Sequence, residues 1–457
     1  MLDNKNKKSK IKKGFTLIEA LALLFIFSVV VVTFYSVFTL GMSHIIESKK
    51  RLGAVSIANQ KIEIIRNLAY DNIGIEDGIP DGPIDSDEYE TVDKITYHVL
   101  TDIKYYDDPF DGTQGGSPND DIPNDYKVAR VTVKWGQELT RQEVFLASTF
   151  VPPGRETNAG GGTLAINIIN SSGGGVPSVD ISLTNGEVGV DLDTVTDSEG
   201  NLLLPGAPAS MNKYEIGLSK NGYETIVTMP PYPGTAYNPT DEHASVIEGL
   251  LNVKAIIMDP LSDINITTID PLDIAIGDVS FSLIGGRTLG TDIDTGDPIY
   301  NYDEDLTSDS GGAENVDDVS PGTYQFTLTG NSETDYKLFK MDPGDDLENS
   351  KFILDPGSSL DINAVIADKS IPSLIVTVKD DAGGSVEEAS VSLVNTTHGY
   401  DVTLETDKYG TVYFPDNTAN LENDDYDISI SATGFSDENG TVTINDLTEE
   451  EFVLNPI

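Results

Sequence analysis

Several oxygen-bearing side chains crowd one short segment of this sequence, and together they offer ligands for a hard cation. Residues 107–124 are rich in Gly, Asp and Pro, which is typical of a loop. Calcium takes several oxygen ligands, and carboxylates at this density could supply them. No EF-hand spacing occurs, however, and the interpretation that the sequence favours is an acidic loop that is solvated without an ion. The calcium candidates are Asp107, Asp108, Asp111, Asn119, Asp120 and Asp121.

A second unusual group is Glu19, which lies inside a long apolar run. Six lysines precede this run within the first thirteen residues, and apolar residues then dominate to about residue 42. A run of this length can cross the apolar core of a bilayer as a helix, and the lysines favour a cytoplasmic N-terminus. An ionised acid at mid-membrane costs about 2.5–3.5 kcal/mol unless it finds a partner. A specific role is therefore expected for Glu19.

The N-terminal segment resembles the class III signal of type IV prepilins and type II secretion pseudopilins, in the motif Lys12-Lys13-Gly14-Phe15-Thr16-Leu17-Ile18-Glu19. The resemblance implies that a prepilin peptidase cuts between Gly14 and Phe15, that Phe15 is N-methylated, and that the apolar helix stays on the mature protein. It also implies that the Glu19 carboxylate pairs with the α-ammonium of Phe15 on a neighbouring subunit. Ser36 stands where many family members have a helix-kinking proline, which leaves the bend of the helix open.

Beyond the apolar run, the spacing of apolar residues predicts that the helix continues to about residue 70. Apolar residues recur at steps of three and four, and the following sheet is the expected partner of this stripe. The stripe consists of Leu52, Val55, Ala58, Ile62, Ile65 and Ala69. An alternating pattern then predicts antiparallel strands around residues 90–106, 126–135 and 142–151, with Trp135 in their core. This part resembles minor pilins of the PilV type and related pseudopilins over residues 1–152.

The remainder of the sequence contains three divergent copies of one β-rich unit. Each copy opens with two alternating strands at the same spacing, and two copies share a Thr-Asp-x-x-Gly turn, beginning at Thr196 and Thr406. The middle copy is degenerate and keeps Ser308-Asp309 with Gly311 at this turn. Short strands broken by Gly, Pro and Asp predict β-sandwiches. Closing strands are expected near residues 251–257, 360–366 and 451–454.

The Thr-Asp-x-x-Gly element resembles the turn of carboxypeptidase-regulatory-like and collagen-adhesin B-type domains. Adhesin domains of this type sometimes contain a lysine–asparagine isopeptide bond between their first and last strands, assisted by a buried acid. The resemblance implies candidates in the third copy only, where Lys379 and Asn455 could react with Glu405 as the acid. An unlinked domain is the expected alternative.

The composition and the motifs exclude several classes of function. Acidic residues exceed basic ones by 48, which argues against nucleic-acid binding because phosphate contacts need Lys and Arg. The sequence has no cysteine, so it can form neither disulfides nor a thiolate metal site. Its four histidines show no metal-binding spacing, and no phosphate loop, nucleophile elbow or zinc-protease motif occurs. We expect no enzymatic activity and no cofactor other than the calcium considered above.

These observations predict an α+β multidomain protein. A long N-terminal transmembrane helix packs on a small antiparallel sheet, and three all-β sandwich domains follow in tandem. The predicted segments are a leader peptide (1–14), the helix (15–70), the pilin-like sheet (71–152), a linker (153–162) and the sandwiches (163–260, 261–371 and 372–457).

The resemblance implies a non-catalytic minor pilin or pseudopilin of a type IV pilus-like filament, displaying its sandwiches at the tip for adhesion or as a spacer. Two alternatives stay open: a pseudopilin of a type II secretion system, and a membrane-tethered surface or carbohydrate-binding protein that does not assemble. Expected partners are prepilin peptidase, other pilins or pseudopilins, the inner-membrane assembly platform, and a cell-surface or carbohydrate ligand. The expected location is the cell membrane, crossed once with the bulk extracellular or periplasmic, and then an extracellular filament.

Overall fold

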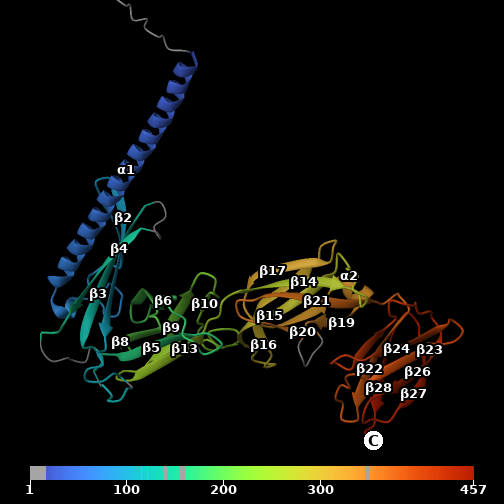
Figure 1. The fold of residues 1–457 in the computed structure, drawn as a ribbon. Helices are drawn as coiled ribbons and strands as arrows, with labels where there is room; N and C mark the ends of the chain where they lie inside the picture. The colour runs from blue at the N-terminus through green and yellow to red at the C-terminus, as the bar shows by residue number, and fades with distance from the viewer. Residues whose placement is uncertain (1–16, 115, 121, 137–141, 154–159, 345–349) are drawn as a thin grey trace, which may run out of the picture. The chain divides into compact units, whose positions relative to one another are not determined.

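The computed structural model describes residues 17–457, apart from residues 115, 121, 137–141, 154–159 and 345–349. Gly14, Phe15 and Asp121 therefore lie outside the described residues. The chain combines one long N-terminal helix with a β-rich remainder, as the sequence predicts (Figure 1). Its contacts divide it into two compact units, Met1–Ala159 and Gly160–Ile457.

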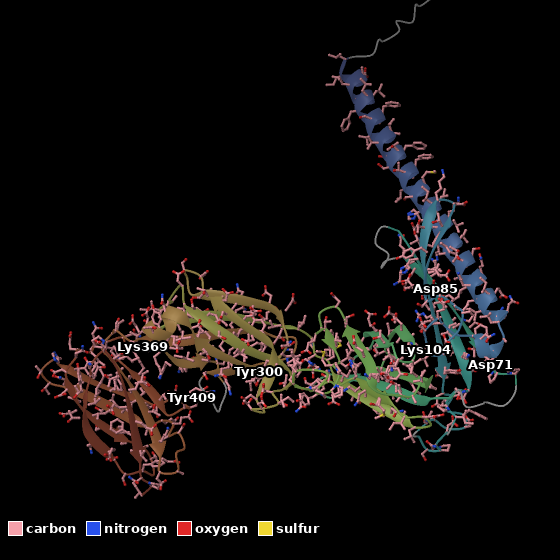
Figure 2. The ribbon with its side chains drawn as sticks, turned by 180° about the vertical axis from the view of Figure 1, so that it is seen from behind. Asp71, Asp85, Lys104, Tyr300, Lys369 and Tyr409 are labelled. Atoms are coloured by element: carbon pink, nitrogen blue, oxygen red, sulfur yellow. The ribbon has the colours of Figure 1, made fainter. Side chains whose placement is uncertain are left out.

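Helix α1 (Leu17–Arg66) is continuous through the apolar run and the amphipathic segment. Every residue from Leu17 to Ile46 is exposed, and the side chains of this half stand clear of the sheet (Figure 2). The helix is long and apolar enough to cross a membrane, with a mean hydropathy of 2.7 in its most apolar window and none of that window buried. The long apolar helix predicted at the N-terminus is therefore present, and it fits membrane anchoring.

The C-terminal half of α1 packs on the first sheet. Its buried residues are Ala54, Ile57, Ala58, Ile62 and Ile65. The predicted stripe was wrong at its two ends, because Leu52 and Ala69 are exposed. Small residues define the contact instead: a Cβ at Gly53 would lie 2.3 Å from the hydroxyl of Tyr97, which donates a hydrogen bond to the carbonyl of Lys50 at 3.0 Å.

The first sheet has four antiparallel strands in sequence order. They are β1 (Asp87–Val92), β2 (Ile95–Tyr106), β3 (Tyr126–Trp135) and β4 (Glu143–Phe150). The single strand predicted over residues 90–106 is instead a hairpin, because Asp93 and Lys94 form a two-residue turn with φ angles of 50° and 65°. Trp135 is buried in the core as predicted, and its indole N–H donates to the Glu47 carboxylate at 2.7 Å.

The second unit begins with a sandwich whose two sheets have strand orders β13-β5-β8 and β10-β9-β6-β7, with β12 paired to β9. Its strands are β5 (Gly162–Ile169), β6 (Asp180–Asn185), β7 (Val190–Val195), β8 (Asn201–Ala207), β9 (Ser210–Ser219), β10 (Ile226–Val227), β12 (Ala244–Val246) and β13 (Leu251–Ile257). We call it sandwich 1.

Sandwich 2 has strand orders β17-β14-β21-β19 and β11-β15-β18-β20, with β16 paired to β15. Its elements are β11 (Asn238–Pro239), β14 (Ser262–Ile269), β15 (Ser280–Thr291), β16 (Pro298–Thr307), β17 (Ala313–Val319), β18 (Gly322–Leu328), α2 (Gly330–Asp335), β19 (Tyr336–Asp342), β20 (Lys351–Leu354) and β21 (Ser359–Asp368). Strand β11 comes from the sequence segment of sandwich 1, so the two sandwiches share a sheet edge.

Sandwich 3 has strand orders β25-β22-β28 and β24-β23-β26-β27. Its strands are β22 (Ser373–Asp380), β23 (Ser390–Asn395), β24 (Tyr400–Glu405), β25 (Thr411–Phe414), β26 (Asp425–Ser431), β27 (Glu438–Thr443) and β28 (Leu447–Leu454).

All three sandwiches repeat the same closure. The first strand of each pairs in parallel with its last strand, as β5 with β13, β14 with β21, and β22 with β28. The predicted closing strands are thereby confirmed. Each sandwich also buries one tyrosine whose hydroxyl bonds to the preceding loop: Tyr214 donates to the Pro208 carbonyl, Tyr324 donates to the Ser320 carbonyl, and Tyr426 accepts from the Glu422 amide.

The Thr-Asp-x-x-Gly turn is held by its own side chains. The Asp197 carboxylate accepts from the amides of Glu199 and Asn201, each at 2.8 Å, and Gly200 adopts a φ of 81°. In sandwich 2 the equivalent glycine is Gly312, with a φ of 85°. The sequence comparison placed Gly311 at this position of the turn. That placement was wrong, because the turn needs a residue with a positive φ, and this residue is Gly312.

Candidate functional site

The acidic loop joins β2 to β3, and the sheet brings its two ends together. Tyr106 and Tyr126 are partners at the end of these antiparallel strands, and their rings stack with centroids 5.0 Å apart. Asp107 directly follows β2, and Asp125 directly precedes β3. Their side chains therefore meet at the end of the sheet, where the loop adds Asp120.

One carboxylate oxygen from each of Asp107, Asp120 and Asp125 lies within 4.8 Å of the other two. The loop backbone supports this cluster, since Asp107 accepts from the amide of Gln114 and Asp120 from the amide of Ile122, each at 2.9 Å. Asp125 accepts from the amide of Asp108. In the described part of the chain, Asp107 Oδ1, Asp120 Oδ2 and Gln114 Oε1 are buried without a hydrogen-bond partner. Buried acceptors left in this way cost about 1–3 kcal/mol each.

The charge of this loop is poorly balanced. Burial raises the pKa of Asp107, and the neighbouring charges of Asp120, Asp111 and Asp108 raise it further, against the hydrogen bond from Gln114. Two basic side chains of the flanking strands are engaged elsewhere. Lys104 pairs with Asp102 at 3.3 Å, and the buried ammonium of Lys127 donates to the carbonyls of Tyr70 and Ile73 at 3.0 and 2.7 Å.

The structure brings together only part of the predicted calcium set. Asp107 and Asp120 belong to the cluster, whereas Asp108 supports the loop by accepting from the amide of Phe110 at 2.9 Å. Asp111 and Asn119 are exposed. Asp125 was missed by sequence reasoning, although its place directly before β3 was a usable signal, because it puts Asp125 at the same end of the sheet as Asp107.

Glu19 lies in the first turn of α1, on the exposed apolar half of the helix. The partner that the resemblance implies for it, the α-ammonium of Phe15, would belong to another subunit.

The isopeptide candidates are not arranged as a buried reactive set. The ammonium of Lys379 pairs with the Glu451 carboxylate at 2.7 Å, where both side chains are at least one-third exposed. Glu405 is exposed at the end of β24, in the sheet that does not contain Lys379. Asn455 is exposed just beyond β28. The structure thus lacks, at these positions, the buried acid beside a lysine that this reaction needs.

No protein-family model matches this chain, and no curated protein matches it. Similar solved structures include the Bacillus anthracis TIE protein, which is 14% identical and matches over 82% of this chain and 74% of its own, with a TM-score of 0.20. A streptococcal ancillary pilin and the major pilin subunit of Bacillus cereus are each 13% identical over 65% of this chain, and match over 99% and 100% of their own lengths with TM-scores of 0.19 and 0.16. TM-scores this low do not establish a common overall fold.

Proposed function

We propose that this protein is a non-catalytic minor pilin or pseudopilin that assembles into a type IV pilus-like filament through α1. The observation that carries the proposal is the exposed apolar half of α1, from Leu17 to Ile46, with Glu19 in its first turn. Apolar surface of this extent is stable only in a bilayer or against other helices. Filament assembly from membrane-held subunits requires such a helix, because it must leave the bilayer and then pack against the helices of other subunits.

The two halves of α1 would then have separate tasks. The C-terminal half is fixed to its own sheet by the buried residues between Ala54 and Ile65, so the helix cannot retract into its own domain. The N-terminal half stays available for helices of neighbouring subunits. Within such a bundle, an ion pair between Glu19 and the α-ammonium of Phe15 would fix the register, because an unpaired charge in a low-dielectric interior is costly.

The three sandwiches would be the displayed part of the subunit. Each has its own closed core and the same parallel pairing of first and last strands. Such modules serve other exported proteins as spacers or binding domains. Since three such modules on every subunit would crowd a shaft, we assign this protein to the tip or to scattered positions, with a cell-surface or carbohydrate partner.

A test of this function compares sheared surface filaments from cells with and without prepilin peptidase. We expect the protein in the filament fraction only when the peptidase is present, because the leader must be removed before the helices can pack.

A variant lacking residues 163–457 should still enter filaments but lose attachment to surfaces or cells. Unchanged attachment would exclude adhesion, and peptidase-independent recovery would favour the tethered, non-assembling protein. Loss of exoprotein export in a deletion strain would instead assign the protein to a type II secretion system.

We also propose that the loop between β2 and β3 binds calcium. Asp107, Asp120 and Asp125 would hold the ion, and the buried acceptors in this loop fit a hard cation. When bound, calcium would neutralise the carboxylates that now repel one another. The ion would thereby order the loop against the end of the sheet.

Calcium should raise the unfolding temperature of the first unit by several degrees. A ligand at about 100 times its dissociation constant stabilises a fold by about 2.7 kcal/mol. Trp135 is the only tryptophan and lies in β3, so its fluorescence reports this unit in the detergent-solubilised chain. Asp120→Asn should remove most of the shift, and Glu76→Gln, an exposed acid of the same unit, should retain it. An unfolding temperature that is the same in calcium and in chelator would contradict the site.

A further inference from the structure

A short arm of sandwich 1 reaches the sheet of sandwich 2. We define the arm as residues 229–243; its base is closed by hydrogen bonds from the Met229 amide to the Asp241 carbonyl and from the His243 amide to the Met229 carbonyl, both 2.8 Å. At its tip, β11 pairs antiparallel with β15, with Asn238 opposite Thr291. The amide of Thr240 extends this pairing by donating to the carbonyl of Leu289 at 2.9 Å.

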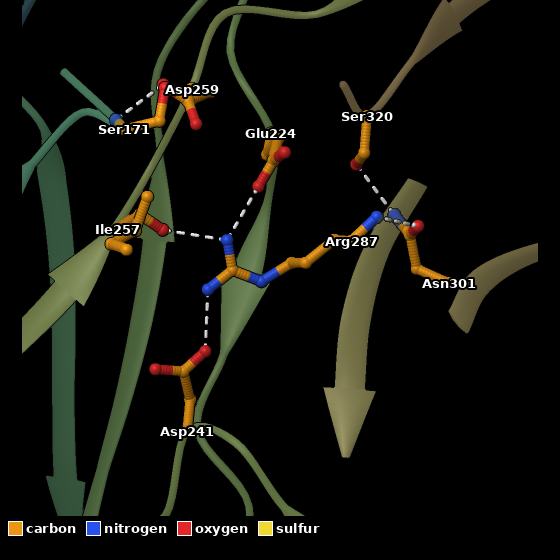
Figure 3. A network of polar contacts seen from close by, with 8 residues as sticks. All are labelled: Ser171, Glu224, Asp241, Ile257, Asp259, Arg287, Asn301 and Ser320. Atoms are coloured by element: carbon orange, nitrogen blue, oxygen red, sulfur yellow. Dashed lines mark hydrogen bonds and ion pairs between the residues drawn. The ribbon is translucent and has the colours of Figure 1, made fainter. Parts of the chain in front are cut away.

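In the opposite direction, the side chain of Arg287 extends from sandwich 2 and contacts sandwich 1. Figure 3 shows the guanidinium of Arg287 between two carboxylates of sandwich 1. It donates to Glu224 at 2.8 Å and to Asp241 at 2.6 Å, and a third bond of 2.7 Å reaches the carbonyl of Ile257. Because Asp241 belongs to the arm, both the pairing of β11 with β15 and the ion pair between Arg287 and Asp241 attach this segment to sandwich 2.

Contacts within sandwich 2 hold the backbone of Arg287 in place. The pairing of β15 with β16 is irregular around Arg287, and Gly286 precedes it with a φ of 78°. Bulges of this kind redirect a side chain away from the regular pleat. The amide of Arg287 donates to Asn301 at 2.8 Å, and Asn301 donates to Ser320 at 2.7 Å (Figure 3). The side chain therefore extends toward sandwich 1 from an anchored backbone.

Burial makes these contacts interdependent. The side chains of Arg287, Glu224 and Asp241 are 14%, 5% and 15% exposed. Burial raises the pKa of Glu224, and the guanidinium of Arg287 opposes that rise. Without the arginine, the carboxylates of Glu224 and Asp241 would both face sandwich 2 with no counter-charge. Removing one partner of a buried ion pair in this way is costly, because the remaining charge stays buried.

We propose that the arm and Arg287 form a reciprocal clasp that makes sandwiches 1 and 2 a single cooperative unit. The described contacts between sandwiches 2 and 3 include a small apolar cluster with Phe339 and Tyr413. They also include two ion pairs that are more exposed than those of Arg287: Lys340 with Asp407 at 3.4 Å, and Lys337 with Glu449 at 3.1 Å. The difference from the clasp is that, among the described strands, no sheet combines sandwiches 2 and 3. The clasp concerns mechanical coupling within the chain and does not depend on filament assembly.

The absence of cysteine in the chain allows a direct test with the full-length protein. Asn238→Cys with Thr291→Cys places two thiols on partner positions of β11 and β15, and Asp180→Cys with Ser219→Cys does the same within sandwich 1 as a positive control. Both pairs should oxidise to a disulfide, since partner positions on adjacent strands lie within disulfide range. The disulfide-linked peptides are identified by mass spectrometry.

Two further substitutions test what holds the clasp. Arg287→Gln removes the charge, and Gly290→Ala places a Cβ 2.2 Å from the carbonyl oxygen of Asn238, which displaces β11. Each should slow cross-linking of the clasp pair at least tenfold while leaving the control pair unchanged. The proposal is overturned if the clasp pair fails to cross-link when the control pair does, or if both substitutions leave its rate unchanged.

Discussion

Glu19→Ala is expected to remove the protein from filaments while leaving its amount in the membrane unchanged. In the proposed assembly, the carboxylate is the partner of the α-ammonium of Phe15 in a neighbouring subunit. Truncating one member of a buried ion pair costs about 3–5 kcal/mol, because the other charge stays buried without a partner. Recovery in the sheared filament fraction should therefore fall at least tenfold relative to the membrane fraction.

The matched control for this substitution is Ser36→Ala. Ser36 lies on the same exposed half of α1, and its hydroxyl donates only to the carbonyl of Val32 in its own helix, at 2.9 Å. The control should assemble normally. If Glu19→Ala enters filaments as efficiently as the control, the apolar helix is a plain membrane anchor and the assembly role of Glu19 is wrong.

The largest expected effect on stability is that of Gly312→Ala in sandwich 2. Gly312 has a φ of 85°, and a Cβ there would lie 2.7 Å from the carbonyl oxygen of Thr268 and 2.9 Å from that of Ile276. Left-handed backbone strain and contact with two backbone oxygens together should cost about 2–4 kcal/mol. Gly311→Ala should be nearly neutral, because a Cβ there comes no closer than 3.2 Å to the Asp309 carboxylate.

Hydrogen exchange of the full chain can measure this difference within sandwich 2. A loss of about 1.4 kcal/mol corresponds to tenfold faster exchange of amides that open by global unfolding. The slowest amides of residues 262–368 should exchange at least tenfold faster in Gly312→Ala and at the wild-type rate in Gly311→Ala. Equal rates in the two variants would show that the repeat does not use Gly312 as its turn residue.

The parts of the fold that were predicted correctly have signals that extend over many residues. The apolar run of α1 is long enough to define a helix by itself. The closing strands, such as β13, followed from alternation and from comparison of three copies. Repeats strengthen such predictions, because one weak pattern is read three times.

The errors came from features decided by single residues. The turn at Asp93-Lys94 was missed because Asp93 is not followed by the glycine that completes the strongest hairpin signals. Leu52 was assigned to the buried stripe because of its spacing, whereas the close approach of Tyr97 depends on Gly53. In both cases tertiary packing decided between local alternatives.

The sites show the same limit. Asp107 and Asp120 were found by composition, but Asp125 joins them only through the pairing of β2 with β3. Arg287 was not singled out at all, since its partners Glu224 and Asp241 lie in a different sandwich. A long-range ion pair leaves no local pattern in one sequence.

The most direct test of the central claim is the N-terminal mass of the mature protein recovered from cells. Prepilin-type processing predicts a chain that begins at Phe15 and carries a methyl group on its α-amino nitrogen, and this product should be absent without prepilin peptidase. A chain that retains Met1 and the lysine-rich leader in the presence of the peptidase would contradict the assembly account and leave a membrane-tethered surface protein.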